Sequence, residues 1–226
     1  ARAGTVDLHV DASNISTTLV LPRERWPLAV SRALAGPVVR YWGELLVFVL
    51  SALFLARVPR SPLAAHEWLL LGLGLSTQSW AVFALMGAWF FAMRWRAQWR
   101  TESASRPVFN LVQIALVLFT ATAIGSLLFS GIRFGFLSAP DMGVAGAGSS
   151  GNSFLWFHDL AHGPLPEVSV WSVPLWSYKL LMFAWASWIA FALTGWLRWA
   201  WGAWTQGGPR PDQAESLAQE SAAPQE

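Results

Sequence analysis

The chain has 226 residues, of which 54% are hydrophobic and 12% are charged, and its formal net charge is +2. Soluble domains average about 25% charged residues, so we expect that much of this surface avoids water. There is no cysteine, which excludes disulfides, thiolate nucleophiles and cysteine-ligated metals. The basic residues form no stripe with stacking aromatics away from the expected membrane edges, so nucleic acid is not an expected partner.

Residues 1–35 are interpreted as the end of an extramembrane β region with an amphipathic approach to the bilayer. Val6, Leu8 and Val10 alternate with polar residues, which is the period of a half-buried strand. Two strands alone are marginally stable, and the start of the chain lacks the pattern of a signal peptide. We therefore expect that the chain is part of a longer protein whose β domain continues upstream.

Four apolar runs predict transmembrane helices, because a span needs about 20 apolar residues. Their expected bounds are 38–58, 68–93, 108–130 and 174–204. Small residues in the third and fourth runs suit close helix packing in a membrane. The predicted fold class is therefore an all-α membrane protein with about four transmembrane helices in residues 36–205 and a short N-terminal β remnant.

The second run has an unusual centre, with Gly72 and Gly74 followed by Ser-Thr-Gln-Ser at 76–79. One tilted helix is expected here. The alternative is a broken or re-entrant helix, because irregular backbone at membrane depth is tolerated only where protein or water covers it.

Two further segments lie outside these runs. The loop 138–173 is long enough to indicate either function or disorder, and its aromatic residues argue against pure disorder, so short strands are expected in it. The tail 206–226 is rich in proline, glycine, glutamine and glutamate, a composition that predicts disorder.

The strongest orientation signal is the stretch 94–106, where arginines alternate with tryptophans. Its four arginines are Arg94, Arg96, Arg100 and Arg106. Arginines beside spans stay on the cytoplasmic side, and tryptophans prefer the headgroup level. With four spans, the side that holds this stretch and both termini carries 11 of the 15 basic residues, so both termini are expected in the cytoplasm. If the second run is re-entrant, three spans remain and the N-terminal strands fall outside.

Glu44 is the acidic residue inside the first run, and an ionisable residue inside a span suggests a functional site with a partner. With four spans it shares a leaflet with Asn110 and Gln113. Together with Gln78 these residues form the predicted intramembrane polar site. The alternative is an interfacial Glu44 that pairs with Arg40 one helical turn earlier.

The segment His158-Asp159-Leu160-Ala161-His162 resembles the first histidine box of membrane fatty-acid desaturases. That resemblance implies about eight histidines around two irons, but the chain has four histidines, which excludes a di-iron site. A single zinc on a helical turn is the weaker alternative, and a pair of exposed polar residues is the expected one. No catalytic residue, cofactor or metal is therefore predicted.

Three stretches, at 21–26, 68–75 and 173–199, carry a resemblance to a broader family. They resemble the C-terminal membrane part of large, functionally uncharacterised proteobacterial inner-membrane proteins, in which β-rich extramembrane sequence precedes a helical bundle. Residues 67–75 are also remotely similar to the CreD inner-membrane family. The resemblance implies no catalytic residues, and it implies a periplasmic β domain.

The expected function is that of a non-enzymatic, multi-pass inner-membrane protein. It would act as a membrane anchor or assembly module in the lipid bilayer, for an upstream extramembrane domain or for other membrane subunits. The alternative is a transporter or channel component that uses Glu44 and the polar patch from Gly72 to Ser79.

Overall fold

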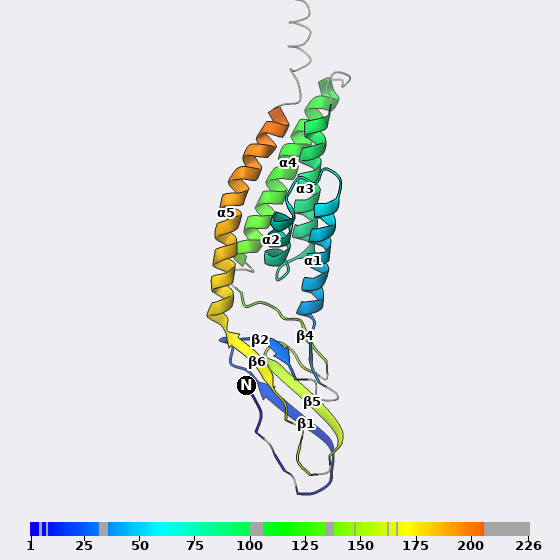
Figure 1. Ribbon diagram of the computed structural model, residues 1–226, viewed down its shortest axis with the longest axis vertical. Coiled ribbons are helices and arrows are strands. Elements are labelled where there is room, and N and C mark those ends of the chain that lie inside the picture. The colour runs from blue at the N-terminus through cyan, green and yellow to red at the C-terminus, as the bar shows by residue number, and fades with distance from the viewer. Residues whose placement is uncertain are drawn as a thin grey trace, which may run out of the picture.

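The computed structural model contains a helical bundle and, at one end of it, a smaller unit of short strands (Figure 1). It describes residues 1–4, 6–7, 9–31, 36–99, 106–133, 138–146, 148–161, 163–165 and 167–205. Within these ranges the chain forms five helices and six strands. The predicted all-α fold class is therefore wrong. The predicted disordered tail, 206–226, lies outside the described residues.

The strands, which we call the β unit, pair two by two in antiparallel sheets. Their bounds are β1 (Ala12–Val20), β2 (Arg25–Val30), β3 (Val38–Val39), β4 (Val144–Ala145), β5 (Ser153–Ala161) and β6 (Val170–Pro174). β1 pairs with β5, β2 with β6 and β3 with β4. The N-terminal strands thus find their partners in the long loop between the third and fourth predicted spans.

Alternating side chains hold the β unit together. In β5, Phe154, Trp156 and His158 are buried, whereas Phe157 and Asp159, which alternate with them, are exposed, as expected of a strand with one covered face. The small core that results consists of Leu21, Phe154, Trp156, Val168 and Val170. Residues from the two distant parts of the chain therefore share one core.

The bundle contains five helices of unequal length. Their bounds are α1 (Tyr41–Arg57), α2 (Ala65–Leu75), α3 (Trp80–Gln98), α4 (Arg106–Ser130) and α5 (Leu175–Thr205). The second predicted span, 68–93, is therefore two helices and not one. The broken-helix alternative is the arrangement that the structure contains.

The break between α2 and α3 has a local cause in the polar residues 76–79. Ser79 caps α3 by accepting a hydrogen bond from the backbone N–H of Ala81, at 3.2 Å. Ser76 donates its hydroxyl back to the carbonyl of Leu73, at 2.7 Å. Short polar side chains of this kind compete with the helix for backbone hydrogen bonds, and serine is a preferred N-cap.

The neighbours of two glycines give the directions of the first three helices. Gly72 of α2 lies against Ala52 of α1, whereas Gly87 of α3 lies between Leu55 of α1 and Trp68 of α2. Moving forward along α1 therefore corresponds to moving backward along α2. As a result α2 is antiparallel to both α1 and α3, and α2 and α3 form a helical hairpin.

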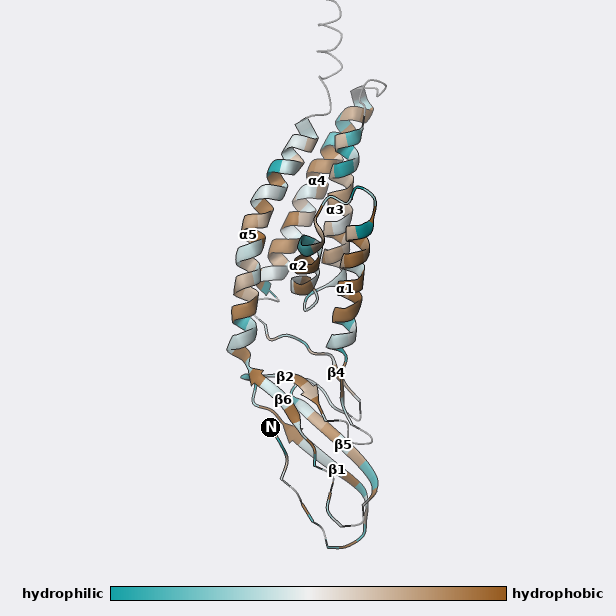
Figure 2. Ribbon diagram, viewed as in Figure 1, coloured by the Kyte–Doolittle hydropathy of each residue, from teal (hydrophilic) through white to brown (hydrophobic). Residues whose placement is uncertain are grey.

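Two helical segments are long and apolar enough to cross a membrane, Pro107–Arg133 and Leu175–Thr205. α1 has 17 residues, fewer than the roughly 20 that a span needs. The prediction of four spans is therefore wrong. Figure 2 shows apolar residues along all the bundle helices, which is why hydropathy alone did not separate the spans from the hairpin.

Strand pairing also determines which helix ends lie together. The starts of α1 and α5 and the end of α4 lie at the β unit (Figure 1). The ends of α3 and α5 and the start of α4 lie at the opposite end, which we call the arginine end. Four spans would have put the N-terminal segment and the loop 138–173 on opposite sides, but β1 and β5 are hydrogen-bonded neighbours.

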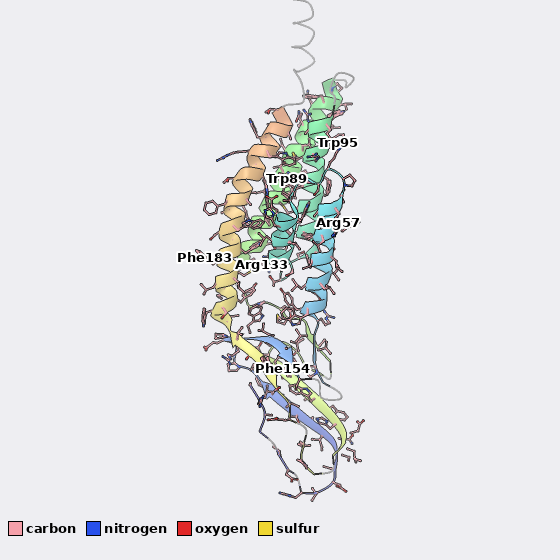
Figure 3. The ribbon with its side chains drawn as sticks, in the orientation of Figure 1. Arg57, Trp89, Trp95, Arg133, Phe154 and Phe183 are labelled. Carbon is pink, nitrogen blue, oxygen red and sulfur yellow. The ribbon has the colours of Figure 1, made fainter. Side chains whose placement is uncertain are left out.

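The interior of the bundle is closed by aromatic side chains. Trp68, Trp89 and Phe90 are fully buried, and the Phe90 ring meets the edge of Trp196 at a centroid distance of 4.9 Å. The Trp89 indole donates to the Thr120 hydroxyl at 3.0 Å. Figure 3 labels Trp89 within the bundle and Phe154 in the β unit. Tryptophans therefore lie in the core of the bundle as well as on its surface.

Candidate functional site

The hairpin turn between α2 and α3 lies near the β-unit end of the bundle, and three other helices bond to it. The Tyr41 hydroxyl of α1 and the Ser76 hydroxyl are 3.1 Å apart, and Tyr178 of α5 donates to the Thr77 hydroxyl at 3.3 Å. From α4, the Ser130 hydroxyl donates to the Gln78 side-chain oxygen at 2.7 Å. We call these residues the turn cluster: Tyr41, Ser76, Thr77, Gln78, Ser130 and Tyr178.

The turn cluster binds the hairpin to its neighbours and offers no reactive group. Ser76 donates to the Leu73 carbonyl, and Gln78 donates to the Gly74 carbonyl at 3.2 Å. A buried hydroxyl that is fully engaged in hydrogen bonds stabilises one arrangement of the chain. Neither a base nor a metal ligand among the described residues bonds to it. The arrangement therefore supports a structural role.

Tight packing of α5 on α2 accompanies the turn cluster. The Trp185 indole donates to the Leu70 carbonyl at 2.8 Å, and its ring covers Gly74 so closely that a Cβ there would overlap it. Beside this contact lies a cavity of about 450 Å³ between α2 and α5, lined mainly by apolar and aromatic residues that include Trp26 and Tyr178. This cavity suits an apolar chain better than a polar metabolite.

The β unit is attached to the bundle by hydrogen bonds as well as by chain connections. The Trp42 indole of α1 donates to the Leu28 carbonyl of β2 at 2.7 Å, and the Leu175 N–H that begins α5 donates to the Glu24 carbonyl at 2.8 Å. The Trp26 ring meets Tyr178 edge-on at 5.3 Å. The turn cluster, α5 and the β unit therefore form one continuous packed junction.

The structure does not bring the predicted intramembrane polar site together. Glu44 lies in the first turn of α1, near the β unit, whereas Asn110 and Gln113 lie at the arginine end, near the start of α4. Gln78 belongs to the turn cluster. Glu44 is 3.9 Å from Arg40, and about half of its side-chain surface is exposed. This is the interfacial alternative that the sequence left open.

Asn110 and Gln113 differ from each other in their surroundings. Asn110 is exposed, whereas the Gln113 side-chain oxygen is buried and accepts no hydrogen bond in the part of the chain that the structure describes. Gln113 lines a small apolar depression beside Trp204. The Gln113 side-chain oxygen is therefore a buried acceptor to which no described residue donates.

Of the four arginines expected to set the topology, two can be described. Arg96 is 1% exposed, although an arginine beside a span is expected to reach water, and Arg94 is half-buried. Arg100 and the Arg106 side chain lie outside the described residues. Trp95 stacks on Trp99 at 5.3 Å, and Figure 3 shows Trp95 towards the arginine end.

The histidine pair does not form the helical metal site that was considered. His158 is a buried residue of strand β5 and lies opposite Ile15 of β1, and His162 lies outside the described residues. Within the described ranges no group of three potential metal ligands occurs.

Sequence reasoning missed Glu67, the two tyrosines and Trp185. Glu67 accepts hydrogen bonds from the Ala64 N–H at 2.9 Å and from the Trp196 indole N–H at 3.4 Å. It therefore caps the first turn of α2 and also contacts α5. The chain has two tyrosines, and both bond to the 76–79 turn. Tyrosines at the first residues of two apolar runs, together with a polar turn in a third, are the signal that could have indicated this cluster.

No protein-family model, curated protein or solved structure matches this chain. The resemblance to large proteobacterial inner-membrane proteins therefore stays a prediction.

Proposed function

We propose that this protein is a non-enzymatic, multi-pass anchor of a bacterial inner membrane that holds an extramembrane domain or partner subunit in a fixed orientation. The observation that carries the proposal is the direct passage from strand to helix: β6 ends at Pro174 and α5 begins at Leu175. A connection without a loop lets the bundle set the direction of whatever the β unit carries. A flexible linker would leave that direction free.

The membrane placement follows from helix lengths and charge. α4 and α5 are the two candidate spans, and α1 with α3 supplies a third crossing in two staggered pieces. Phe48 of α1 stacks on Trp80 of α3 at 3.7 Å, so the two helices together rise about 37 Å. This matches the bilayer core of about 30 Å with some excess.

The orientation follows from the arginines. The short stretch 94–106 favours the cytoplasm for the arginine end, so the β unit faces the periplasm. This differs from the sequence-based count of basic residues, which assumed that the N-terminal strands and the arginine stretch lie on the same side.

The β unit offers surface to a partner. Among the described strands, neither β1 nor β5 has a second strand neighbour, and an open sheet edge can pair with an added strand. Trp171 of β6 and Leu160 of β5 are 72% and 61% exposed. Large apolar residues on a unit outside the lipid suit contact with another protein.

The topology can be tested by single-cysteine labelling, because the chain has no native cysteine. Cysteines replacing Ser13 and Ser150, on the β unit, should react with an impermeant maleimide added to intact spheroplasts. A cysteine replacing Ser103 should react only after permeabilisation. A shielded Ser13→Cys would contradict the proposed placement.

The anchor role can be tested with a photo-crosslinking amino acid at Trp171 or Leu160 in living cells. We expect a discrete protein adduct from each position. The matched control is Phe191 of α5, which is 79% exposed but lies on a candidate span, and which should yield lipid adducts alone. Absence of any protein adduct from both β-unit positions would argue against the anchor.

One observation favours a transport role instead, namely the polar turn 76–79 within the bundle. Its hydroxyls are already bonded to neighbouring helices, and the aromatic core beyond it is closed. Measuring ion flux in proteoliposomes for the wild type and Glu44→Gln separates the two functions. Flux that the substitution abolishes, at normal protein levels, would favour the transporter.

A further inference from the structure

The arginine end contains a buried positive charge that no described carboxylate neutralises. The Arg96 side chain is 1% exposed. Its Nη2 donates to the Trp204 carbonyl at 3.3 Å, and its guanidinium lies 5.6 Å from the Trp99 ring centroid and 5.7 Å from that of Phe109. Aromatic faces stabilise a cation, but a buried guanidinium without an anion remains costly.

Several polar atoms around Arg96 lack partners as well. Nε and Nη1 of Arg96 and the indole nitrogen of Trp204 are buried donors without an acceptor in the described part of the chain. The Gln113 oxygen is a buried acceptor without a donor. Gln113 lies beside Trp204, and we call Arg96, Trp204 and Gln113 the arginine cluster. Buried polar groups are nearly always paired, so a cluster dominated by free donors calls for an acceptor-rich anion.

An apolar groove leads to this cluster along the outside of the bundle. It has a volume of about 310 Å³ and is lined by Met93 of α3, Leu116, Val117 and Ala121 of α4, and Leu197 and Trp201 of α5. Val117, Leu197 and Trp201 are 49%, 39% and 63% exposed, so the groove opens outward. Trp204 lines its head, and Arg96 is bonded to the carbonyl of that same residue.

The cluster lies at the depth of a lipid headgroup. Adding the rise of α1 up to Phe48 to that of α3 from Trp80 places Arg96 about 34 Å from Tyr41 along the bundle. If Tyr41 marks the periplasmic interface, the opposite interface of a core of about 30 Å falls just before Arg96. The groove then runs back into the acyl region.

We propose that the groove between α4 and α5 and the arginine cluster bind one anionic glycerophospholipid of the cytoplasmic leaflet. An acyl chain occupies the groove, and the phosphate lies at its head. There it accepts hydrogen bonds from Trp204 and Arg96 once the Trp204 side chain turns aside. A headgroup hydroxyl donates to Gln113.

The chemistry favours this ligand over the other anions in reach. Phosphate oxygens match the forked donors of a guanidinium, and a free phosphate would leave the groove empty. A carboxylate of the chain itself, such as Glu102, would also leave the groove without an occupant. The inference rests on the membrane placement proposed above but does not depend on the anchor role.

The test is lipid retention by the whole purified chain, measured by native mass spectrometry after delipidation in detergent. Phosphatidylglycerol and phosphatidylcholine with identical acyl chains are titrated separately. We expect one phosphatidylglycerol to be retained preferentially. Arg96→Gln should weaken that retention about tenfold or more, because it removes charge-assisted hydrogen bonds.

Three further variants keep the test interpretable even if Arg96→Gln fails to fold. Ala121→Phe fills the groove and should reduce retention, whereas Ala115→Phe adds the same volume on α4 outside the groove lining and should not. Arg57→Gln removes an arginine from another helix end and serves as the charge control. Circular dichroism and gel filtration verify that each variant is folded.

Four outcomes would overturn the proposal. The first is equal retention of both lipids, and the second is no effect of either Arg96→Gln or Ala121→Phe. The third is thermal protection by inorganic phosphate that Ala121→Phe does not alter. The fourth is phosphatidylglycerol binding that appears only in Glu102→Gln. The last would mean that the chain's own carboxylate occupies the arginines. None of these outcomes bears on β-unit crosslinking, so the anchor role is tested separately.

Discussion

The two ends of the helical bundle satisfy their polar groups in opposite ways. At the β-unit end, Tyr41, Tyr178 and Ser130 each bond to a different residue of the hairpin turn. At the arginine end, donors of Arg96 and Trp204 have no acceptor in the described chain. The bonded hydroxyls of the turn cluster indicate a junction that is completed within the chain, whereas the unpaired buried donors of Arg96 and Trp204 indicate one that is completed by another molecule.

The largest loss of stability is expected from adding a side chain at Gly74. Gly74→Val puts side-chain atoms where the Trp185 ring lies, so α2 and α5 must separate, which we expect to cost about 1–3 kcal/mol. Thermal unfolding in detergent measures the loss. Gly125→Ala is the control, because a Cβ there meets nothing within 4 Å. Equal stability of the two variants would contradict the tight contact.

Removing hydroxyls from the turn cluster tests whether it is a finished junction. Tyr41→Phe and Tyr178→Phe each delete one hydrogen bond and should each lower the free energy of unfolding by about 1 kcal/mol. Thr122→Val is the comparison, since Thr122 is exposed and bonds only to Leu118 of its own helix. If the tyrosine variants behave like Thr122→Val, the cluster does not hold the hairpin.

At the arginine end, removing a polar side chain is expected to raise the free energy of unfolding and not to lower it. In lipid-free detergent, Arg96→Met replaces an unneutralised buried charge with an apolar side chain and should raise the free energy of unfolding, on the order of 1 kcal/mol. Added phosphatidylglycerol should reverse the order of wild type and variant. A variant that is less stable than the wild type without lipid would indicate that the arginine is already neutralised.

The smallest effect is expected for Glu44. Its carboxylate is half-exposed and 3.9 Å from Arg40, and exposed pairs at this spacing contribute about 0.3–0.5 kcal/mol. Glu44→Gln should therefore leave thermal unfolding nearly unchanged. A large loss would show that Glu44 has a partner beyond Arg40.

Local patterns predicted the long helices but not the hairpin. The runs 108–130 and 174–204 correspond to α4 and α5 within a few residues, because an uninterrupted apolar run leaves few alternatives. The run 68–93 has a similar hydropathy profile, yet it folds back at Ser76 and Ser79. Hydropathy sums over a window and does not register a reversal of direction, whereas the four consecutive polar residues do.

Neither the pairing of β1 with β5 nor the burial of Arg96 could be predicted from the sequence. The alternation at Val6, Leu8 and Val10 predicted a strand, and β1 begins just after it, but nothing local indicates that the partner of β1 is β5, more than a hundred residues later. The burial of Arg96 was equally hidden, because the rule that places arginines at membrane edges does not foresee a guanidinium between Trp99 and Phe109. Glu44 misled for the opposite reason: its position within a run suggested depth, whereas the helix begins only three residues before it.

The absence of a loop between β6 and α5 has a mechanical consequence. α5 has 31 residues and is about 46 Å long, and Trp185 holds it against α2 about a third of the way along its length. It can therefore act as a lever whose short arm is the β unit and whose far tip carries Trp204. Each degree of tilt about Trp185 moves Trp204 by about 0.5 Å. A load applied to the strands is thus transmitted to the arginine end of the bundle through a single helix.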